Sequence, residues 1–216
     1  MRGRIMLVLL FVLLVVAPRA QAFVVINEIF ADPAAGLAGD ANGDGVRSQT
    51  DDEFLEILNF TDQSVNLSGW TLKDAVSTRH VFPANTFLSP YQFLVVFGGG
   101  SPNLPGINWQ LASTGGLSLN NTLETVTLSD LNNQVIDQIT YGNLANQDRS
   151  IVRFPEATGN FVLHSSLAQA NGALFSPGKS IDGRSLAPST VPEPSSLSCL
   201  LLGALALIRR RPGRQI

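Results

Sequence analysis

The chain has 216 residues, with 14 Lys and Arg against 17 Asp and Glu, and its formal net charge at pH 7 is −3. An acidic balance without a basic stripe argues against a nucleic-acid-binding protein. The single cysteine, Cys199, lies near the C-terminus and excludes a disulfide framework, a thiol nucleophile in the body of the chain and a zinc site built from cysteines.

A secretory signal peptide is predicted at residues 1–22. Arg2 and Arg4 precede the apolar run IMLVLLFVLLVVA, and Ala20 and Ala22 form an A-x-A cleavage site. An uncleaved membrane anchor is the alternative, but the apolar run is short and the cleavage site closely follows it. We therefore expect an exported protein whose mature chain begins at Phe23.

The body of the chain, residues 23–184, has the pattern of an all-β domain. The runs FVVINEIF, EFLEILNF, WTLK, HVF, FLVVF, ETVTLSD and QVIDQITYG are rich in β-branched and aromatic residues, and turn-forming residues separate them. No long segment has the 3.6-residue period of an amphipathic helix. Short strands at close spacing predict a β-sandwich.

Two of these runs allow more detailed expectations. In EFLEILNF, charged and apolar residues occur on both faces, so we expect this strand to be buried over only part of its length. ETVTLSD and QVIDQITYG, joined by residues 131–133, are expected to form a hairpin. Its buried face should contain Val126 and Leu128 on one arm and Val135 and Ile139 on the other.

DANGDG, residues 40–45, begins a candidate calcium loop. Oxygen-bearing side chains occupy positions 1, 3 and 5 of the calcium-loop pattern, a glycine at position 6 permits the sharp turn, and a carboxylate follows at position 12. The last ligand is Asp rather than the usual Glu, which resembles the dockerin-type calcium loop. A solvated polar turn is the alternative. The expected ligands in the loop 40–51 are the side chains, or at position 7 the backbone carbonyl, of Asp40, Asn42, Asp44, Val46, Ser48 and Asp51.

The surroundings of this loop favour a structural calcium ion over a catalytic one. The flanking helices of an EF-hand are missing, because GLAG precedes the loop and a strand follows it. Extracellular calcium modules typically bind with dissociation constants of about 10⁻⁴–10⁻³ M. Without calcium, the clustered carboxylates would have Arg47 as their only basic neighbour in the sequence, so we expect their repulsion to leave the loop mobile.

The sequence predicts no catalytic residue. Glu53 and Glu56 are three apart on a strand and therefore point to opposite faces, so we expect a rim charge and a partner for a loop rather than a glycosidase pair. His80 and His164 belong to no ligand motif, so we expect surface or strand-end positions. No G-x-S-x-G motif occurs, and GGGS at 98–101 predicts a flexible turn.

Nearly the whole body resembles the lamin tail domain family. The resemblance implies an immunoglobulin-like β-sandwich with Trp70 in its core, and it does not imply catalysis. The role of Trp109 stays open. The matching segments are NEI at 27–29, DEFLEILNFTDQSVNLSGWTLKD at 52–74, HVFPANTFLSPYQFLVVF at 80–97, LETVTLSDLNNQVIDQITYG at 123–142 and SPGKS at 176–180.

The C-terminal end resembles the PEP-CTERM sorting signal, after a Ser- and Pro-containing linker at 185–191. A helix over the apolar residues 197–208 would span about 18 Å, short of the ~30 Å hydrocarbon core of a bilayer. The resemblance implies a transient inner-membrane intermediate in a Gram-negative bacterium, which an exosortase-type enzyme processes. An ordinary C-terminal anchor is the alternative. The residues of this signal, which covers 192–214, are Pro192, Glu193 and Pro194, and the basic cluster Arg209, Arg210 and Arg211.

Removal of both end segments makes the mature body strongly acidic. Seven of the 14 basic residues lie in those segments, whereas all 17 acidic residues lie between Phe23 and Pro194, which leaves a net charge of −10. These features favour an exported, non-enzymatic surface or extracellular-matrix module, stabilised by calcium, with exopolysaccharide or surface proteins as candidate partners. A calcium-dependent carbohydrate- or protein-binding adhesin is the alternative, and a secreted hydrolase with an unrecognised site is a weaker one.

Overall fold

The computed structural model describes residues 24–186, so the predicted signal peptide and the predicted sorting signal lie outside the described residues. Within that range the chain is all-β, as predicted. The strands are β1 (Val24–Phe30), β2 (Phe54–Asn59), β3 (Val65–Asn66), β4 (Thr71–Lys73), β5 (Thr78–Val81), β6 (Phe87–Leu88), β7 (Phe93–Phe97), β8 (Trp109–Leu111), β9 (Glu124–Ser129), β10 (Val135–Tyr141), β11 (Ile151–Phe154) and β12 (Asn160–Leu163). Short 3₁₀ helices are η1 (Gly36–Gly39), η2 (Asn143–Ala145), η3 (His164–Ser166) and η4 (Ala168–Ala170). None of the helices between residues 24 and 186 has the length and apolar character needed to cross a membrane.

The strands form two main sheets. The larger has the order β12-β11-β1-β2-β7-β8, the smaller has the order β10-β9-β4-β5, and β3 pairs separately with β6. Neighbouring strands are antiparallel except for β7 and β8, which are parallel. Strands β1 and β2 therefore lie in the middle of the larger sheet, with a hydrogen-bonded neighbour on each side.

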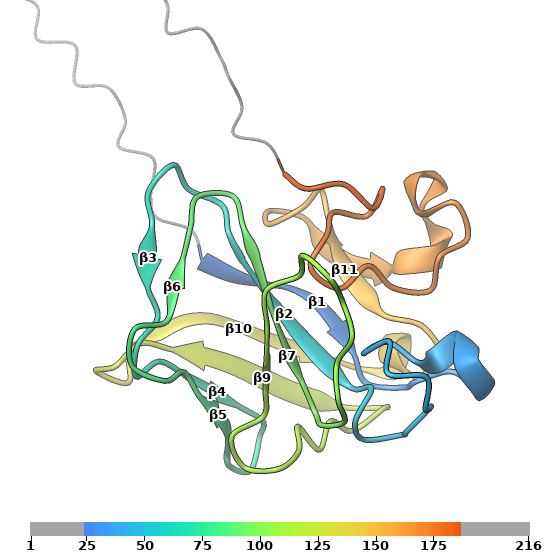
Figure 1. The fold of residues 1–216 in the computed structure, drawn as a ribbon, viewed down its shortest axis with the longest axis horizontal. Coiled ribbons are helices and arrows are strands. Elements are labelled where there is room, and N and C mark those ends of the chain that lie inside the picture. The colour runs from blue at the N-terminus through green and yellow to red at the C-terminus, as the bar shows by residue number, and fades with distance from the viewer. Residues whose placement is uncertain (1–23, 187–216) are drawn as a thin grey trace, which may run out of the picture. The chain divides into compact units, whose positions relative to one another are not determined.

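The main hydrophobic core lies between the two sheets (Figure 1). Side chains that alternate along each strand reach this core from both sheets, as expected for a sandwich. Trp70 is partly buried and packs against the same core. The fully buried side chains of this core include Ile26, Leu55 and Ile57 from the larger sheet and Leu72, Val126 and Leu128 from the smaller sheet.

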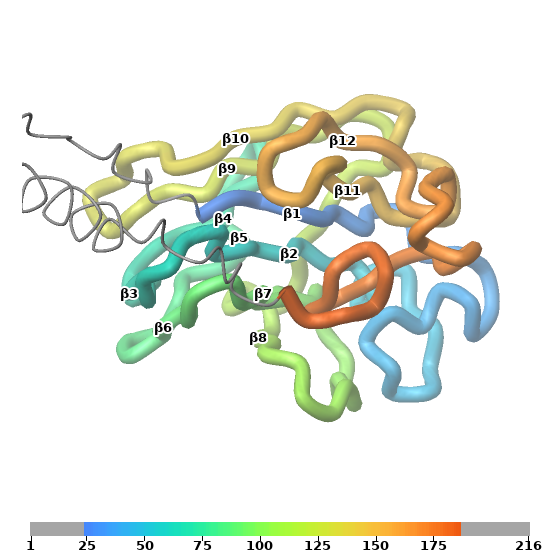
Figure 2. The backbone as a smooth tube through the Cα atoms, turned by 90° about the horizontal axis from the view of Figure 1, so that it is seen from above, coloured from blue at the N-terminus to red at the C-terminus, as the bar shows by residue number. Residues whose placement is uncertain are grey.

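Loops cover the other face of the larger sheet. Phe30, Phe54 and Phe97 form a second buried cluster there, and Phe175 from the C-terminal segment packs against it. Figures 1 and 2 place the segment that follows β1 and the segment that follows β12 at the same end of the domain, opposite the β3–β6 pair. Because both faces of the sheet are covered, β2 is buried along its whole length, and the expectation of partial burial was wrong.

The β9–β10 hairpin forms as predicted, with one difference. Val126 and Leu128 are fully buried, and Asn133 in the turn has a φ of 61°. Ile139 packs against the core, but Val135 is 53 % exposed rather than buried. The register shifts within β10 directly after Val135. This bulge adds one residue, so Val135 and Ile139 no longer share a face.

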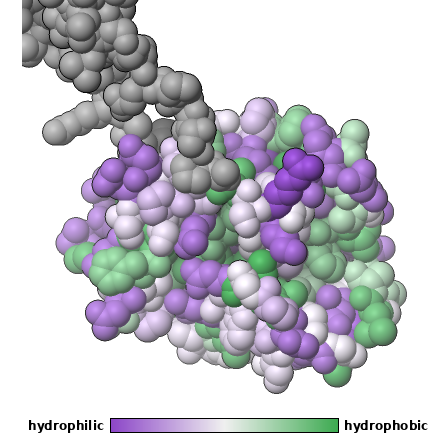
Figure 3. Space-filling view, turned by 45° about the horizontal axis from the view of Figure 1, so that its top comes forward, coloured by the Kyte–Doolittle hydropathy of each residue, from purple (hydrophilic) through white to green (hydrophobic). Residues whose placement is uncertain are grey.

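Trp109 lies outside the core, on the edge strand β8, and is 36 % exposed. Other large apolar side chains at the surface, such as Val81 on β5 and Phe87 on β6, belong to different strands. The face of the domain seen in Figure 3 has hydrophilic and hydrophobic residues interspersed. Scattered apolar residues of this kind are normal on a folded domain.

Candidate metal loop and the neighbouring cavity

A buried carboxylate, Asp52, organises the loop between β1 and β2. Its Oδ1 accepts the N–H groups of Ala41 at 2.9 Å and Asn42 at 3.1 Å, and its Oδ2 accepts the N–H of Ser48 at 2.7 Å. Burial raises the pKa of Asp52, and the three donors offset part of this effect. The calcium-loop pattern did not include Asp52, because it lies one position beyond the last ligand of that pattern.

The side chains at the start of the loop bind backbone donors further along it. Asp40 Oδ2 accepts the Gly45 N–H at 2.9 Å, Asn42 Oδ1 accepts the Asp44 N–H at 3.0 Å, and Asp44 Oδ1 accepts the Val46 N–H at 2.9 Å. The last two contacts each join residues two apart and stabilise tight turns of Asx type, whereas the first spans five residues. The other oxygen of Asp40, Oδ1, is buried and has no hydrogen-bond partner among the described residues.

The glycine segment 98–100 forms the surface on which the loop rests. A Cβ on Gly100 would collide with Asn42 Nδ2 and lie 2.7 Å from Asp44 Oδ2, and a Cβ on the preceding glycine would collide with the Asp51 carboxylate. The Ser101 N–H donates to Asp44 Oδ2 at 3.0 Å and holds the pKa of Asp44 below its usual range. A Cβ on Gly98 would collide with the backbone carbonyl oxygen of Thr50, and Gly100 has a φ of 78°, so GGGS is more than the flexible turn that was expected.

The candidate ligands are only partly gathered. Across residues 24–186, no three His, Cys, Asp or Glu side chains lie in an arrangement that could hold a metal ion. The glycine segment nevertheless brings Asn42, Asp44 and Asp51 to one place, and the buried Oδ1 of Asp40 lacks a donor. The Ser48 hydroxyl accepts the Asp51 N–H at 3.1 Å. The donor set, all oxygen, fits calcium, but the aspartates would have to move closer together to bind it.

A second acidic group lies on the outer face of the larger sheet. Glu28 on β1 and Glu56 on β2 are opposite each other in the strand pairing, and both are fully buried. Asn27 Nδ2 links this pair to a third carboxylate, because it donates to Glu56 Oε1 at 3.0 Å and to Glu156 Oε2 at 2.7 Å. Burial, and then the charge of Glu28, raise the pKa of Glu56 well above its usual range, and burial also raises the pKa of Glu156.

These three carboxylates hold the segment 176–181 by its backbone. The segment contains SPGKS, residues 176–180, and a Cβ on its glycine would collide with the side chain of Ile107. Each carboxylate accepts one N–H group: Ser176 donates to Glu28 at 3.0 Å, Gly178 to Glu56 at 2.7 Å and Ile181 to Glu156 at 2.8 Å.

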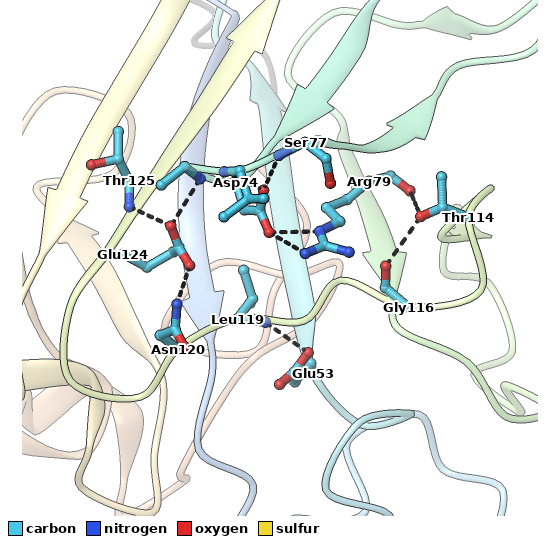
Figure 4. Close-up of polar contacts among 12 residues, drawn as sticks. Glu53, Asp74, Ser77, Arg79, Thr114, Gly116, Leu119, Asn120, Glu124 and Thr125 are labelled. Carbon is cyan, nitrogen blue, oxygen red and sulfur yellow. Dashed lines mark hydrogen bonds and ion pairs between the residues drawn. The ribbon is translucent and has the colours of Figure 1, made fainter.

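Glu53 directly precedes β2 and contacts Leu119 of the main core, whereas Glu56 contacts the segment 176–181 on the outer face, as predicted for opposite faces. Neither glutamate is the exposed rim charge that was expected. Glu53 is 3 % exposed and accepts the Leu119 N–H at 3.2 Å. Burial raises its pKa to about 8, although the backbone donor offsets part of the effect. Figure 4 shows this contact beside a second polar group, in which Asp74 forms an ion pair with Arg79.

Both histidines are buried, so the expected surface position was wrong, although His164 does lie at a strand end, directly after β12. His80, on β5, contacts Gln110 Oε1 at 2.9 Å through Nε2 and accepts the Ser113 N–H at 3.2 Å through Nδ1. Burial lowers the pKa of His80. His164 Nδ1 donates to the Ala173 carbonyl at 3.0 Å. The two rings therefore hold separate loops in place, and they belong to different sites.

A cavity of about 480 Å³ lies beside the loop. It forms where the loop, the segment 104–107 and the C-terminal segment 169–183 meet. No local sequence pattern predicted this cavity, because its walls come from three distant parts of the chain. Its lining includes Asp40, Ala41, Leu104, Ile107, Phe175 and Lys179.

Comparison with known proteins supports the family resemblance. The family model described as Lamin Tail Domain matches residues 17–143, which is more than half of the chain. The matched range contains the strands β1 to β10, the candidate calcium loop and the glycine segment 98–100. No curated protein matches the chain.

Proposed function

Because this chain belongs to the lamin tail domain family, we propose that it is an exported, non-enzymatic surface or extracellular-matrix module whose long loop is stabilised by calcium. The observation that carries the calcium proposal is the buried Oδ1 of Asp40, which has no donor among the described residues. A buried carboxylate oxygen without a partner costs free energy, and a bound cation would remove that cost.

Calcium would be held by six groups of the loop and would neutralise its aspartates while tying its two ends together. Asp52 is not among these groups, since three backbone N–H groups already occupy its carboxylate. The loop would then keep its shape without flanking helices. The proposed ligands are the side chains of Asp40, Asn42, Asp44, Ser48 and Asp51 and the carbonyl of Val46.

Calcium should raise the melting temperature of the mature protein. At a concentration about ten times the dissociation constant, binding stabilises the folded state by about 1.4 kcal/mol, which corresponds to a rise of about 3–6 °C in a domain of this size. Asp40→Ala should abolish the rise. Asp62→Ala removes an exposed carboxylate outside the loop and should retain it. A melting temperature that does not change up to millimolar calcium would rule out the stabilising role.

Export and sorting form a separate part of the proposal. We expect N-terminal sequencing of the mature protein to begin at Phe23, after cleavage that depends on Ala20 and Ala22. Replacement of Pro192, Glu193 and Pro194 by alanine should leave unprocessed protein in the inner membrane, because the exosortase-type enzyme would no longer recognise it. Release of that variant at the normal rate would refute the sorting proposal.

A carbohydrate- or protein-binding adhesin is the second candidate function. The cavity favours it, because Asp40 and Ala41 of the loop form part of its lining. A secreted hydrolase has less support, since both oxygens of the buried Glu56 carboxylate already accept hydrogen bonds. Turnover of an ester, phosphate or glycoside substrate that one point change abolishes would overturn the non-enzymatic proposal.

A further inference from the structure

We propose that the cavity beside the loop binds one neutral sugar residue, either as a free glycoside or as the end unit of a glycan. This inference rests on the carbohydrate-binding part of the second candidate function and specifies its ligand, but, unlike the calcium-dependent adhesin that the sequence suggested, it does not require calcium. The cavity volume of about 480 Å³ lies within the range of ~300–1,000 Å³ that is usual for small-molecule sites.

The floor of the cavity is apolar, and buried side chains beneath it support it. Leu104, Ile107 and Phe175 pack against the phenylalanine cluster on the outer face of the larger sheet. The Phe175 ring lies 5.0 Å from the ring of Phe30, and part of its surface stays exposed. A pyranose ring has one face made mainly of C–H groups, and such a face packs well on an aromatic and aliphatic surface.

The part of the cavity wall that the segment 176–181 forms is also held in place without a ligand. Ser176 and Ile181 line the cavity, and their N–H groups are held by Glu28 and Glu156. Pre-formed walls reduce the entropy that a ligand must lose to bind. The buried carboxylates therefore act on the cavity through the backbone of the segment 176–181.

The rim offers unused hydrogen-bonding groups of both kinds. Within residues 24–186, the Lys179 ammonium and the Gln169 side-chain amide form no hydrogen bond, and the Asn171 side chain makes only one long contact, at 3.4 Å to a neighbouring carbonyl. Sugar hydroxyls both donate and accept, so they suit a rim that contains ammonium, amide and carboxylate groups.

The charges at the rim favour a neutral ligand. Asp182 is paired with Arg184 at 3.5 Å, which leaves Asp40 and Lys179 as opposite charges at the cavity. An anion would meet Asp40, a cation would meet Lys179, and an apolar ligand would bury polar groups without partners. A neutral polyhydroxylated ligand avoids all three costs.

The test is a calorimetric titration of the processed, full-length mature protein with the neutral methyl glycosides of glucose, galactose and mannose. We expect saturable binding of at least one of them at millimolar concentration or below. Ala173→Trp fills the cavity from an exposed position and should weaken binding by about tenfold or more. Ala84→Trp makes the same change in the exposed turn before β6 and should leave binding unchanged.

Two further variants keep the test decisive if Ala173→Trp fails to fold. Gln169→Ala and Lys179→Met alter exposed side chains, so the fold should persist while affinity falls by about threefold or more. Binding that none of these variants changes would overturn the cavity as the site. Binding of butylammonium or butyrate in place of every glycoside would overturn the ligand class.

The same titrations, run with calcium and with a chelator, separate this inference from the calcium proposal. Glycoside binding that persists in the chelator supports the cavity, whatever calcium does to the melting temperature. A calcium-dependent melting shift without any glycoside binding contradicts the sugar site and leaves the calcium loop standing.

Discussion

Urea should unfold the mature protein more easily as the pH rises from about 5 to about 9. Glu53 is the clearest cause, because burial raises its pKa from 4.5 to about 8. Between these two values the folded protein keeps a proton that the unfolded chain releases. The stabilisation is therefore fully present below about pH 4.5 and is lost as the pH rises through about 8.

Two further groups act in the same direction. Burial raises the pKa of Glu56 and of Glu156, and the neighbouring Glu28 adds to the effect on Glu56. Deprotonation would place adjacent negative charges in a dry site that also holds the segment 176–181. Since one unit of pKa corresponds to about 1.4 kcal/mol, the rise at Glu53 alone corresponds to a loss of several kcal/mol of unfolding free energy, and the shifts of Glu56 and Glu156 add to it in the same direction.

The variant Glu53→Gln tests this assignment. Glutamine retains an oxygen for the Leu119 N–H but has no proton to lose. The unfolding free energy of the variant should therefore fall less steeply as the pH rises, and at about pH 9 it should exceed that of the wild type. Asp182→Asn is the control. The Ser180 hydroxyl holds the pKa of Asp182 below its usual range. The substitution should therefore change the pH dependence of stability only below about pH 4. If the unfolding free energies of the wild type and Glu53→Gln change in parallel with pH, the account is contradicted.

Asp52→Ala should destabilise the protein more than any change of a proposed calcium ligand, even in the absence of calcium. Removal of the carboxylate leaves three N–H donors without their acceptor, and two of these contacts are buried. Each buried donor without a partner costs about 1–3 kcal/mol, so loss of the two buried contacts alone should lower the free energy of unfolding by about 2–6 kcal/mol. Urea unfolding in the presence of a chelator measures it.

Asp51→Ala is the matched control for this result. The hydrogen bonds of Asp51 that stabilise the loop use its backbone, namely its N–H to Ser48 Oγ and its carbonyl to the Gly99 N–H. In a chelator, Asp51→Ala should therefore lower the free energy of unfolding by less than about 1 kcal/mol. With calcium present, Asp51→Ala should not show the increase in unfolding free energy that calcium gives the wild type. Equal losses for the two variants in a chelator would show that Asp52 does not organise the loop.

Local patterns explain which parts of this structure could be predicted from the sequence. Strands such as β7 and β9 are rich in β-branched and aromatic residues and are bounded by turns, so they were recognised. The candidate loop was also visible, because its spacing lies within twelve residues. The strands β11 and β12 were missed. They are only four residues long and carry polar residues, which weakens the local signal.

The parts that were missed depend on distant contacts. Glu28 and Glu56 look like surface charges until the segment 176–181, more than 100 residues away, covers them. Glycine is needed in the segment 98–100 because the Thr50 carbonyl oxygen lies where a Cβ on Gly98 would stand and because Gly100 has a positive φ. Charged residues within otherwise apolar strands, and three consecutive glycines directly after a buried strand, were the available signals.

Calorimetric titration of the mature protein with calcium tests the central claim most directly. The account predicts one saturable site per chain with a dissociation constant of about 10⁻⁴–10⁻³ M, absent in Asp40→Ala and retained in Asp62→Ala. Heats that show no saturable binding, or binding that Asp40→Ala leaves intact, would contradict it.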